Sequence, residues 1–151
     1  MAATAGNTES KTVPEILSLA FGAVYVLVGI VGFFITGFDN FFGNEAAPGV
    51  HHADENLLGF MINPAHNVVH ILIGAVGLAL SRTLAGARTY GWLLAVGYAA
   101  AFVYGLIATD KDWDFLSLNW ADNFLHLATA VVGLVIALLP VRTAVDSRST
   151  R

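Results

Sequence analysis

The chain has 151 residues, of which 56% are hydrophobic and 12% are charged, and its formal net charge is −4. A soluble domain carries about 25% charged residues, so lipid is expected to be the solvent for most of this chain. The negative charge argues against a nucleic-acid partner, and the lack of cysteine excludes disulfides, thiolate catalysis and iron–sulfur clusters.

Four apolar stretches predict an all-α fold, a four-transmembrane-helix bundle in a single domain over residues 1–151. The expected spans are about 15–38, 63–80, 90–108 and 119–140. The connections are a long loop at 39–62, with an apolar end expected on the membrane surface, and short ones at 81–88 and 109–118. The ends, residues 1–13 and 143–151, are predicted to be flexible tails.

The basic residues predict the orientation of the chain in the membrane. Lys111 falls on one side, and all the others fall on the opposite side: Lys11, Arg82, Arg88, Arg142, Arg148 and Arg151. Because cytoplasmic loops carry the excess of lysine and arginine, both termini are expected to be cytoplasmic. The loops 39–62 and 109–118 are then extracytoplasmic.

An internal repeat at an offset of 56 residues relates the second span to the fourth. NPAHNVVHILIGAVGLAL at 63–80 aligns with NWADNFLHLATAVVGLVI at 119–136, with seven identities among the 18 positions. Several identities are polar, and polar residues are scarce in this chain. The repeat therefore predicts two helical hairpins, each ending in a helix with a polar outer end.

The polar residues of the repeat are the candidate site. His66 and His70, like Asp122 and His126, are separated by four residues and share one helix face. Polar side chains avoid hydrocarbon, so both faces are expected to turn inward and converge. The supporting residues are Asn63 and Asn119, predicted helix caps, together with Asn67 and Asn123.

Small residues predict close helix packing. Gly97, Ala101 and Gly105 follow each other at intervals of four and would form a packing stripe on the third span.

The motif N-P-x-H-N-x-x-H at 63–70, with D-N-x-L-H-L at 122–127, resembles a family of small bacterial four-helix membrane proteins catalogued as a domain of unknown function. The resemblance covers roughly residues 15–140. It implies the four-span fold and a bacterial cytoplasmic membrane, and it implies no activity.

Three functional interpretations remain open. In the first, the cluster is structural and the protein is an assembly or accessory subunit, whose partners are the lipid bilayer and other membrane subunits or a second copy. In the second, His66, His70, Asp122 and His126 bind zinc or copper, or His70 and His126 hold haem b, with room for the porphyrin beside Gly74 and Ala130. His51 and His52 could join a metal site, although solvation is the simpler expectation for them.

The third interpretation is proton or ion movement, which the apolar inner halves of these spans disfavour. The chain also lacks the motifs of a conventional enzyme.

Overall fold

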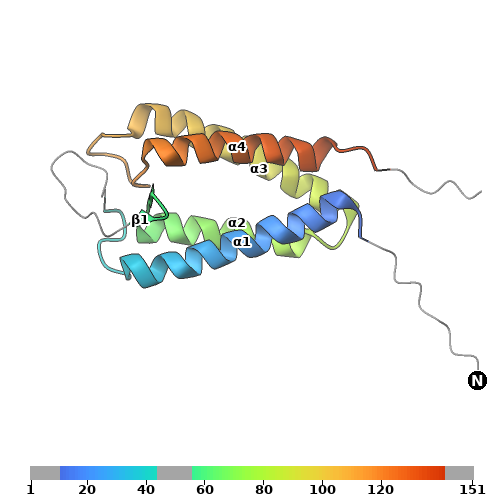
Figure 1. Cartoon of the computed structure of the whole chain (residues 1–151), viewed down its shortest axis with the longest axis horizontal. Coiled ribbons are helices and arrows are strands. Elements are labelled where there is room, and N and C mark those ends of the chain that lie inside the picture. Colours follow the sequence, from blue (N-terminus) through green and yellow to red (C-terminus); the bar gives the residue numbers. More distant parts are fainter. Residues whose placement is uncertain (1–10, 44–55, 142–151) are drawn as a thin grey trace, which may run out of the picture.

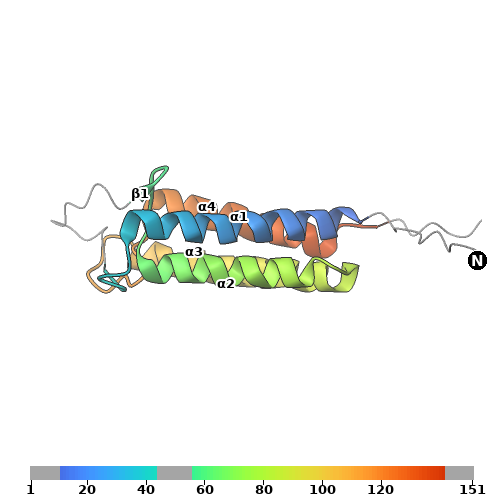
Figure 2. The ribbon, with the colours of Figure 1, turned by 90° about the horizontal axis from the view of Figure 1, so that it is seen from below.

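Four helices make up most of the described chain: α1 Val13–Thr36, α2 Pro64–Leu80, α3 Leu84–Ala108 and α4 Trp120–Leu138. A computed structural model describes residues 11–43 and 56–141, in which the helices run along one common axis (Figures 1 and 2). Three helices, α1, α3 and α4, are long and apolar enough to cross a membrane, whereas α2 has 17 residues and is shorter. The prediction of an all-α four-helix bundle in a membrane protein is confirmed.

The bundle consists of two hairpins, α1 with α2 and α3 with α4, and contacts within each hairpin are much denser than those between them. Glycines allow this close approach. A Cβ atom added to Gly22 would lie 2.7 Å from the Leu78 amide nitrogen, and Gly133 of α4 faces the backbone of Ala95 in the same way. Small residues let helix backbones approach where lipid supplies no hydrophobic force. The predicted pair of hairpins is therefore observed.

Aromatic side chains fill the space between the hairpins. Tyr25 of α1 stacks on Tyr98 of α3, with their ring centroids 5.5 Å apart. Around them lies the buried core, Tyr90, Leu94, Ala130 and Ile136. The α2 and α4 backbones make no close contact, so these two helices lie diagonally across the bundle.

The turn between α2 and α3 is shorter than the sequence predicts. α3 begins at Leu84, not near Tyr90, because Thr83 caps it by accepting a hydrogen bond from the Gly86 amide at 3.0 Å. At the same end of the bundle, the Lys11 ammonium donates to the Ser81 carbonyl at 3.1 Å. Lys11, Arg82 and Arg88 thus belong to the end of the bundle where α1 and α3 begin, whereas Lys111 belongs to the α3–α4 loop at the opposite end (Figure 1).

The apolar end of the long loop forms a small β-hairpin, and its place on the membrane surface stays a prediction. β1, Asn56–Leu57, pairs antiparallel with β2, Phe60–Met61. The two turn residues have positive φ, 57° at Leu58 and 93° at Gly59, as a tight two-residue hairpin turn requires. The hairpin sits at the end of the bundle near α1 and α4 (Figure 1). Residues 1–10 of the predicted N-terminal tail, the whole predicted C-terminal tail (143–151), and His51 and His52 lie outside the described residues.

Candidate functional site

Both predicted asparagine caps are present. Asn63 accepts a hydrogen bond from the His66 amide at 2.8 Å, and Asn119 accepts one from the Asp122 amide at 3.0 Å. The Asp122 carboxylate accepts in return from the Asn119 amide at 3.0 Å, which completes a capping box. These bonds explain why an asparagine starts each copy of the repeat.

The cap asparagines also hold the connections at this end of the bundle. The Asn63 side-chain amide donates to the carbonyls of Gly43, at 2.8 Å, and Phe115, at 2.9 Å. The Asn119 side-chain amide donates to the Gly59 carbonyl at 2.8 Å and so holds the β-hairpin. Both asparagines are therefore structural residues.

Asn67 and Asn123 have the same structural role in the two hairpins. The Asn67 side-chain amide donates to the Thr36 hydroxyl, and the Asn123 amide donates to the Thr109 hydroxyl, each at 3.0 Å. Each asparagine lies against a glycine of the neighbouring helix, Gly32 for Asn67 and Gly105 for Asn123. We call these two arrangements the Asn–Thr pairs.

The Asn–Thr pairs reveal a second internal repeat, which the alignment at an offset of 56 residues does not contain. Thr36 and Thr109 are 73 positions apart, as are Gly32 and Gly105 and also Tyr25 and Tyr98. α3 therefore repeats α1, just as α4 repeats α2, and the pseudo-twofold relation includes all four helices. The two offsets differ because the α1–α2 connection is longer than the α3–α4 connection, which hides the repeat from a search at one spacing.

His66, His70 and His126 converge between the hairpins, and we call them the histidine centre. The ring centroid of His66 lies 4.5 Å from that of His70 and 6.3 Å from that of His126. The three residues are only 3%, 8% and 4% exposed. Tyr25 lies 5.3 Å from His70, and Tyr98 lies 5.4 Å from His126, by ring centroids. The predicted convergence of the two polar faces is therefore observed for all three imidazoles.

The Nδ1 nitrogen is unused in each imidazole of the histidine centre. The Nδ1 atoms of His66, His70 and His126 are buried and have no hydrogen-bond partner within the described ranges. Buried polar atoms in proteins are normally satisfied, so each such atom calls for an explanation. Imidazole nitrogens can donate a hydrogen bond, accept one or bind a metal.

Asp122 stands apart from the histidine centre. Its carboxylate is used by the capping box and faces the backbone of Met61 in β2. Over residues 11–43 and 56–141, no group of three or more histidine, aspartate or glutamate residues has the arrangement of a metal site. The four-ligand set with Asp122 therefore stays a prediction, and the same finding applies to the three imidazoles taken by themselves.

Two seams between the hairpins contain cavities that reach the histidine centre. Along the α2–α3 seam, a chamber of about 220 Å³ is lined by all three histidines. It adjoins a second, apolar space of about 260 Å³. On the other side, the α1–α4 seam contains a cavity of about 200 Å³ that is lined by His70 and Asp122 and bordered by the β-hairpin.

Two expectations about small residues are wrong. Of the predicted stripe, Gly105 packs on Asn123, but Gly97 packs on nothing, since an added Cβ would meet no atom within 4 Å. Gly97 and Ala101 line the α2–α3 chamber instead. Gly74 does not leave free space for a porphyrin, because its open side is occupied by the Val26 and Gly22 backbone of α1.

Sequence reasoning missed the part played by Asp114, which organises the loop between α3 and α4. Its buried carboxylate accepts from the Leu118 amide at 2.6 Å, from the Leu116 amide at 3.1 Å and from the Tyr104 hydroxyl at 2.9 Å. The acidic loop contains several aspartates, and nothing in their spacing marks this one.

Comparisons with known proteins give one result. No curated protein and no solved structure matches the chain. One family model matches residues 15–139, which include all four helices except the first two residues of α1. The chain belongs to the family described as "Domain of unknown function (DUF4383)".

Proposed function

We propose that this protein is a small accessory protein of the bacterial cytoplasmic membrane whose histidine centre binds a ligand. The supporting observation is the set of three buried Nδ1 atoms without a protein partner. Inside a membrane an unsatisfied polar group costs several kcal/mol. A purely structural cluster would be expected to satisfy its imidazole nitrogens.

The polar residues then divide into two groups. Asn63, Asn67, Asn119 and Asn123 hold caps, connections and helix pairs, and their amide groups donate to named partners. The three imidazoles border a cavity, and their Nδ1 nitrogens have no partner among the described residues. Architecture is thus assigned to the asparagines, and binding is assigned to the histidines.

A transition metal is the second candidate. The observation in its favour is the distance of 4.5 Å between the ring centroids of His66 and His70, although no group of three or more described residues is arranged as a metal site. Neutral imidazole suits zinc and copper, and no cysteine is needed. Haem b between His70 and His126 fits less well, because Tyr25 and Tyr98 stack on each other directly beside these two rings.

The proposed topology places the end that carries Lys11, Arg82 and Arg88 in the cytoplasm, following the distribution of basic residues. The histidine centre then lies in the outer half of the bilayer, since His66 and His70 belong to the first turns of α2. The bilayer is the main partner, and the exposed apolar faces leave room for a second membrane subunit or copy.

The test is purification of the full chain in mild detergent, followed by native mass spectrometry, an absorption spectrum and elemental analysis. We expect a bound small molecule or a stoichiometric metal in the wild-type protein and its loss from His66→Phe and His126→Phe. Asn119→Ala, which removes a cap outside the centre, is the matched control and should retain the ligand. Identical occupancy in all four proteins, or a wild type that binds neither added metal nor lipid-soluble ligands, would contradict the proposal.

A further inference from the structure

The two spaces along the α2–α3 seam form one continuous groove. Ile73, Gly97 and Tyr98 line both the chamber at the histidine centre and the apolar space beyond it. From His66 to Val76 the groove follows ten residues of α2, or about 15 Å at the rise of an α-helix. We call this the seam groove.

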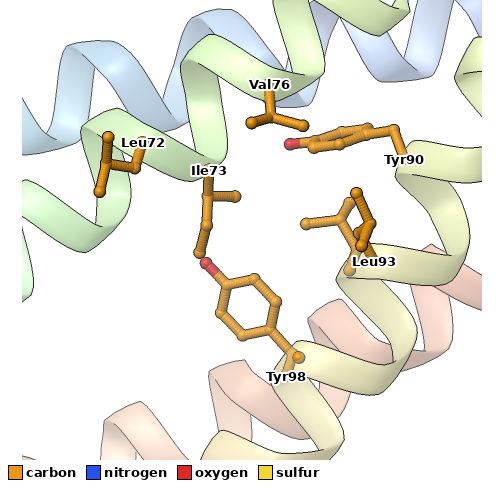
Figure 3. A pocket seen from close by; sticks show the side chains of 8 residues that line it. Leu72, Ile73, Val76, Tyr90, Leu93 and Tyr98 are labelled. Atoms are coloured by element: carbon orange, nitrogen blue, oxygen red, sulfur yellow. The ribbon is translucent and has the colours of Figure 1, made fainter.

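The seam groove is polar at one end and apolar along the rest. Beyond the chamber its lining is aliphatic and aromatic: Leu72, Ile73, Val76, Tyr90, Leu93, Leu94, Gly97 and Tyr98. In Figure 3 both labelled tyrosines of α3 point their hydroxyls toward α2 across the groove. Leu72 and Leu93 are also exposed on the bundle surface, so this part of the groove borders the region of the acyl chains.

The pseudo-twofold relation supplies an internal comparison, because the α1–α4 cavity is built from equivalent positions. His66 corresponds to Asp122 and Tyr98 to Tyr25, at the offsets of 56 and 73. Where the seam groove has Gly97 and Ala101, the other cavity has Val24 and Val28.

The β-hairpin makes a further difference between the seams. Leu57, Leu58 and Phe60 line the α1–α4 cavity and border its outer end, and none of them lines the seam groove. One seam is therefore lined by valines and bordered by the hairpin, while its counterpart is lined by Gly97 and Ala101.

We propose that the seam groove binds a lipid-soluble quinone, with the ring in the chamber and the apolar tail along α2 and α3. This inference rests on the proposed function and names the ligand class for the same centre. No lysine, arginine or carboxylate lines the groove, which favours a neutral head over a phosphate or carboxylate. Four rings border the chamber, those of Tyr98 and the three histidines, and they suit a flat ring.

The three imidazoles that line the chamber supply the polar contacts. A quinone carbonyl accepts hydrogen bonds, and a neutral imidazole donates one from whichever ring nitrogen carries its proton. The proposed contacts are therefore N–H groups of the histidine centre donating to the carbonyl oxygens, in a site where water does not compete. Binding involves no covalent step.

The experiment measures saturable binding of decylubiquinone to the full chain in detergent, by gel filtration and the absorbance of the bound quinone. Gly97→Leu fills the groove without displacing backbone, since an added Cβ meets nothing. Its matched control is Ala99→Leu, an exposed position of α3 that lines neither seam. His70→Phe keeps the ring and removes its nitrogens. Decylbenzene, which has a tail and a ring but no carbonyl, is the ligand control.

We expect one quinone per chain, with affinity lowered at least about tenfold by Gly97→Leu and about fivefold by His70→Phe. Ala99→Leu should bind as the wild type does, and decylbenzene should bind at least about tenfold more weakly. Far-UV circular dichroism and gel filtration confirm that each variant is folded. Equal binding by Gly97→Leu and wild type, or equal binding of the two ligands, overturns the inference. A wild type that binds zinc through its histidines but no quinone overturns it too, and leaves the proposed function standing.

Discussion

At the scale of single residues, the same side-chain type has different roles according to its partners. Asn67 directly follows His66, and Asn123 directly follows Asp122. The side-chain amides of both asparagines donate to threonines within their own hairpins. The histidines nearby keep a nitrogen free. Sequence spacing places both types on inward faces, but it does not show which of their polar atoms have a partner.

The Asn–Thr pairs depend on the glycine beside each asparagine. Gly105→Ala would bring a Cβ atom against the Asn123 amide and push it away from Thr109, whereas Gly97→Ala on the same helix meets no atom within 4 Å. We expect Gly105→Ala to lower the free energy of unfolding by about 1–3 kcal/mol and Gly97→Ala to leave it nearly unchanged. Unfolding in mixed micelles with increasing SDS measures both. Equal stability of the two variants would contradict this account of the Asn–Thr pairs.

The capping box of α4 offers a second residue-scale prediction. Asn119→Ala removes the acceptor for the Asp122 amide and the donor to Gly59. Loss of a cap typically costs about 1 kcal/mol, so the unfolding midpoint should fall. Asn119→Asp retains a capping oxygen and should recover the part of the loss that comes from the helix terminus, measured in the same micelle titration. Full stability of Asn119→Ala would show that the cap is dispensable.

At the scale of elements, the β-hairpin is an element that the sequence did not predict. Gly59 permits its tight turn, and the Asn119 side-chain amide donates to the Gly59 carbonyl at 2.8 Å. Leu58 occupies the other turn position with φ of 57° and is 89% exposed. A leucine in the left-handed region is strained, so this backbone conformation lowers the stability of the folded protein.

That strain predicts the effect of an asparagine at the turn. Leu58→Asn places a residue that tolerates positive φ at this position, so we expect the thermal unfolding midpoint to rise, corresponding to about 0.5–1 kcal/mol. Leu57→Asn, in the adjacent strand, gains no such backbone relief and should be neutral or destabilising. Differential scanning fluorimetry of both variants checks the result. A lower midpoint for Leu58→Asn would mean that the leucine side chain contributes more than its backbone conformation costs.

At the scale of the whole molecule, the pseudo-twofold relation explains why the site lies between the hairpins. Glycine contacts bring α1 onto α2 and α3 onto α4, while larger side chains separate the two hairpins. The seams left between the hairpins contain the cavities, and the diagonal helices α2 and α4 bring their histidines there.

The orientation in the membrane can be tested directly because the chain contains no cysteine. A single cysteine at Asp112→Cys, an exposed loop position, should react with a membrane-impermeant maleimide in intact bacterial cells. Arg82→Cys, exposed at the opposite end, should react only after the membrane is permeabilised. The physical reason is the excess of basic residues on the Arg82 side. The reverse labelling pattern would invert the topology without altering the bundle.

The sequence by itself determined the number of helices, their pairing as two repeated hairpins, the asparagine caps and the convergence of the histidines. These features follow from local composition and helix periodicity, which act over one or two turns. It did not determine the start of α3, the β-hairpin or the repeat of α1 in α3, because those depend on a cap, a turn and connections of unequal length.

Only the tertiary structure decided which polar atoms are satisfied and where space remains. Gly105 and Gly97 look alike in the sequence, yet one is covered by Asn123 and the other opens into the seam groove. The difference arises from the neighbouring helix, which no pattern within α3 can specify. For the same physical reason, the sequence could place His66, His70 and His126 inside the bundle but could not show that each keeps an unused nitrogen.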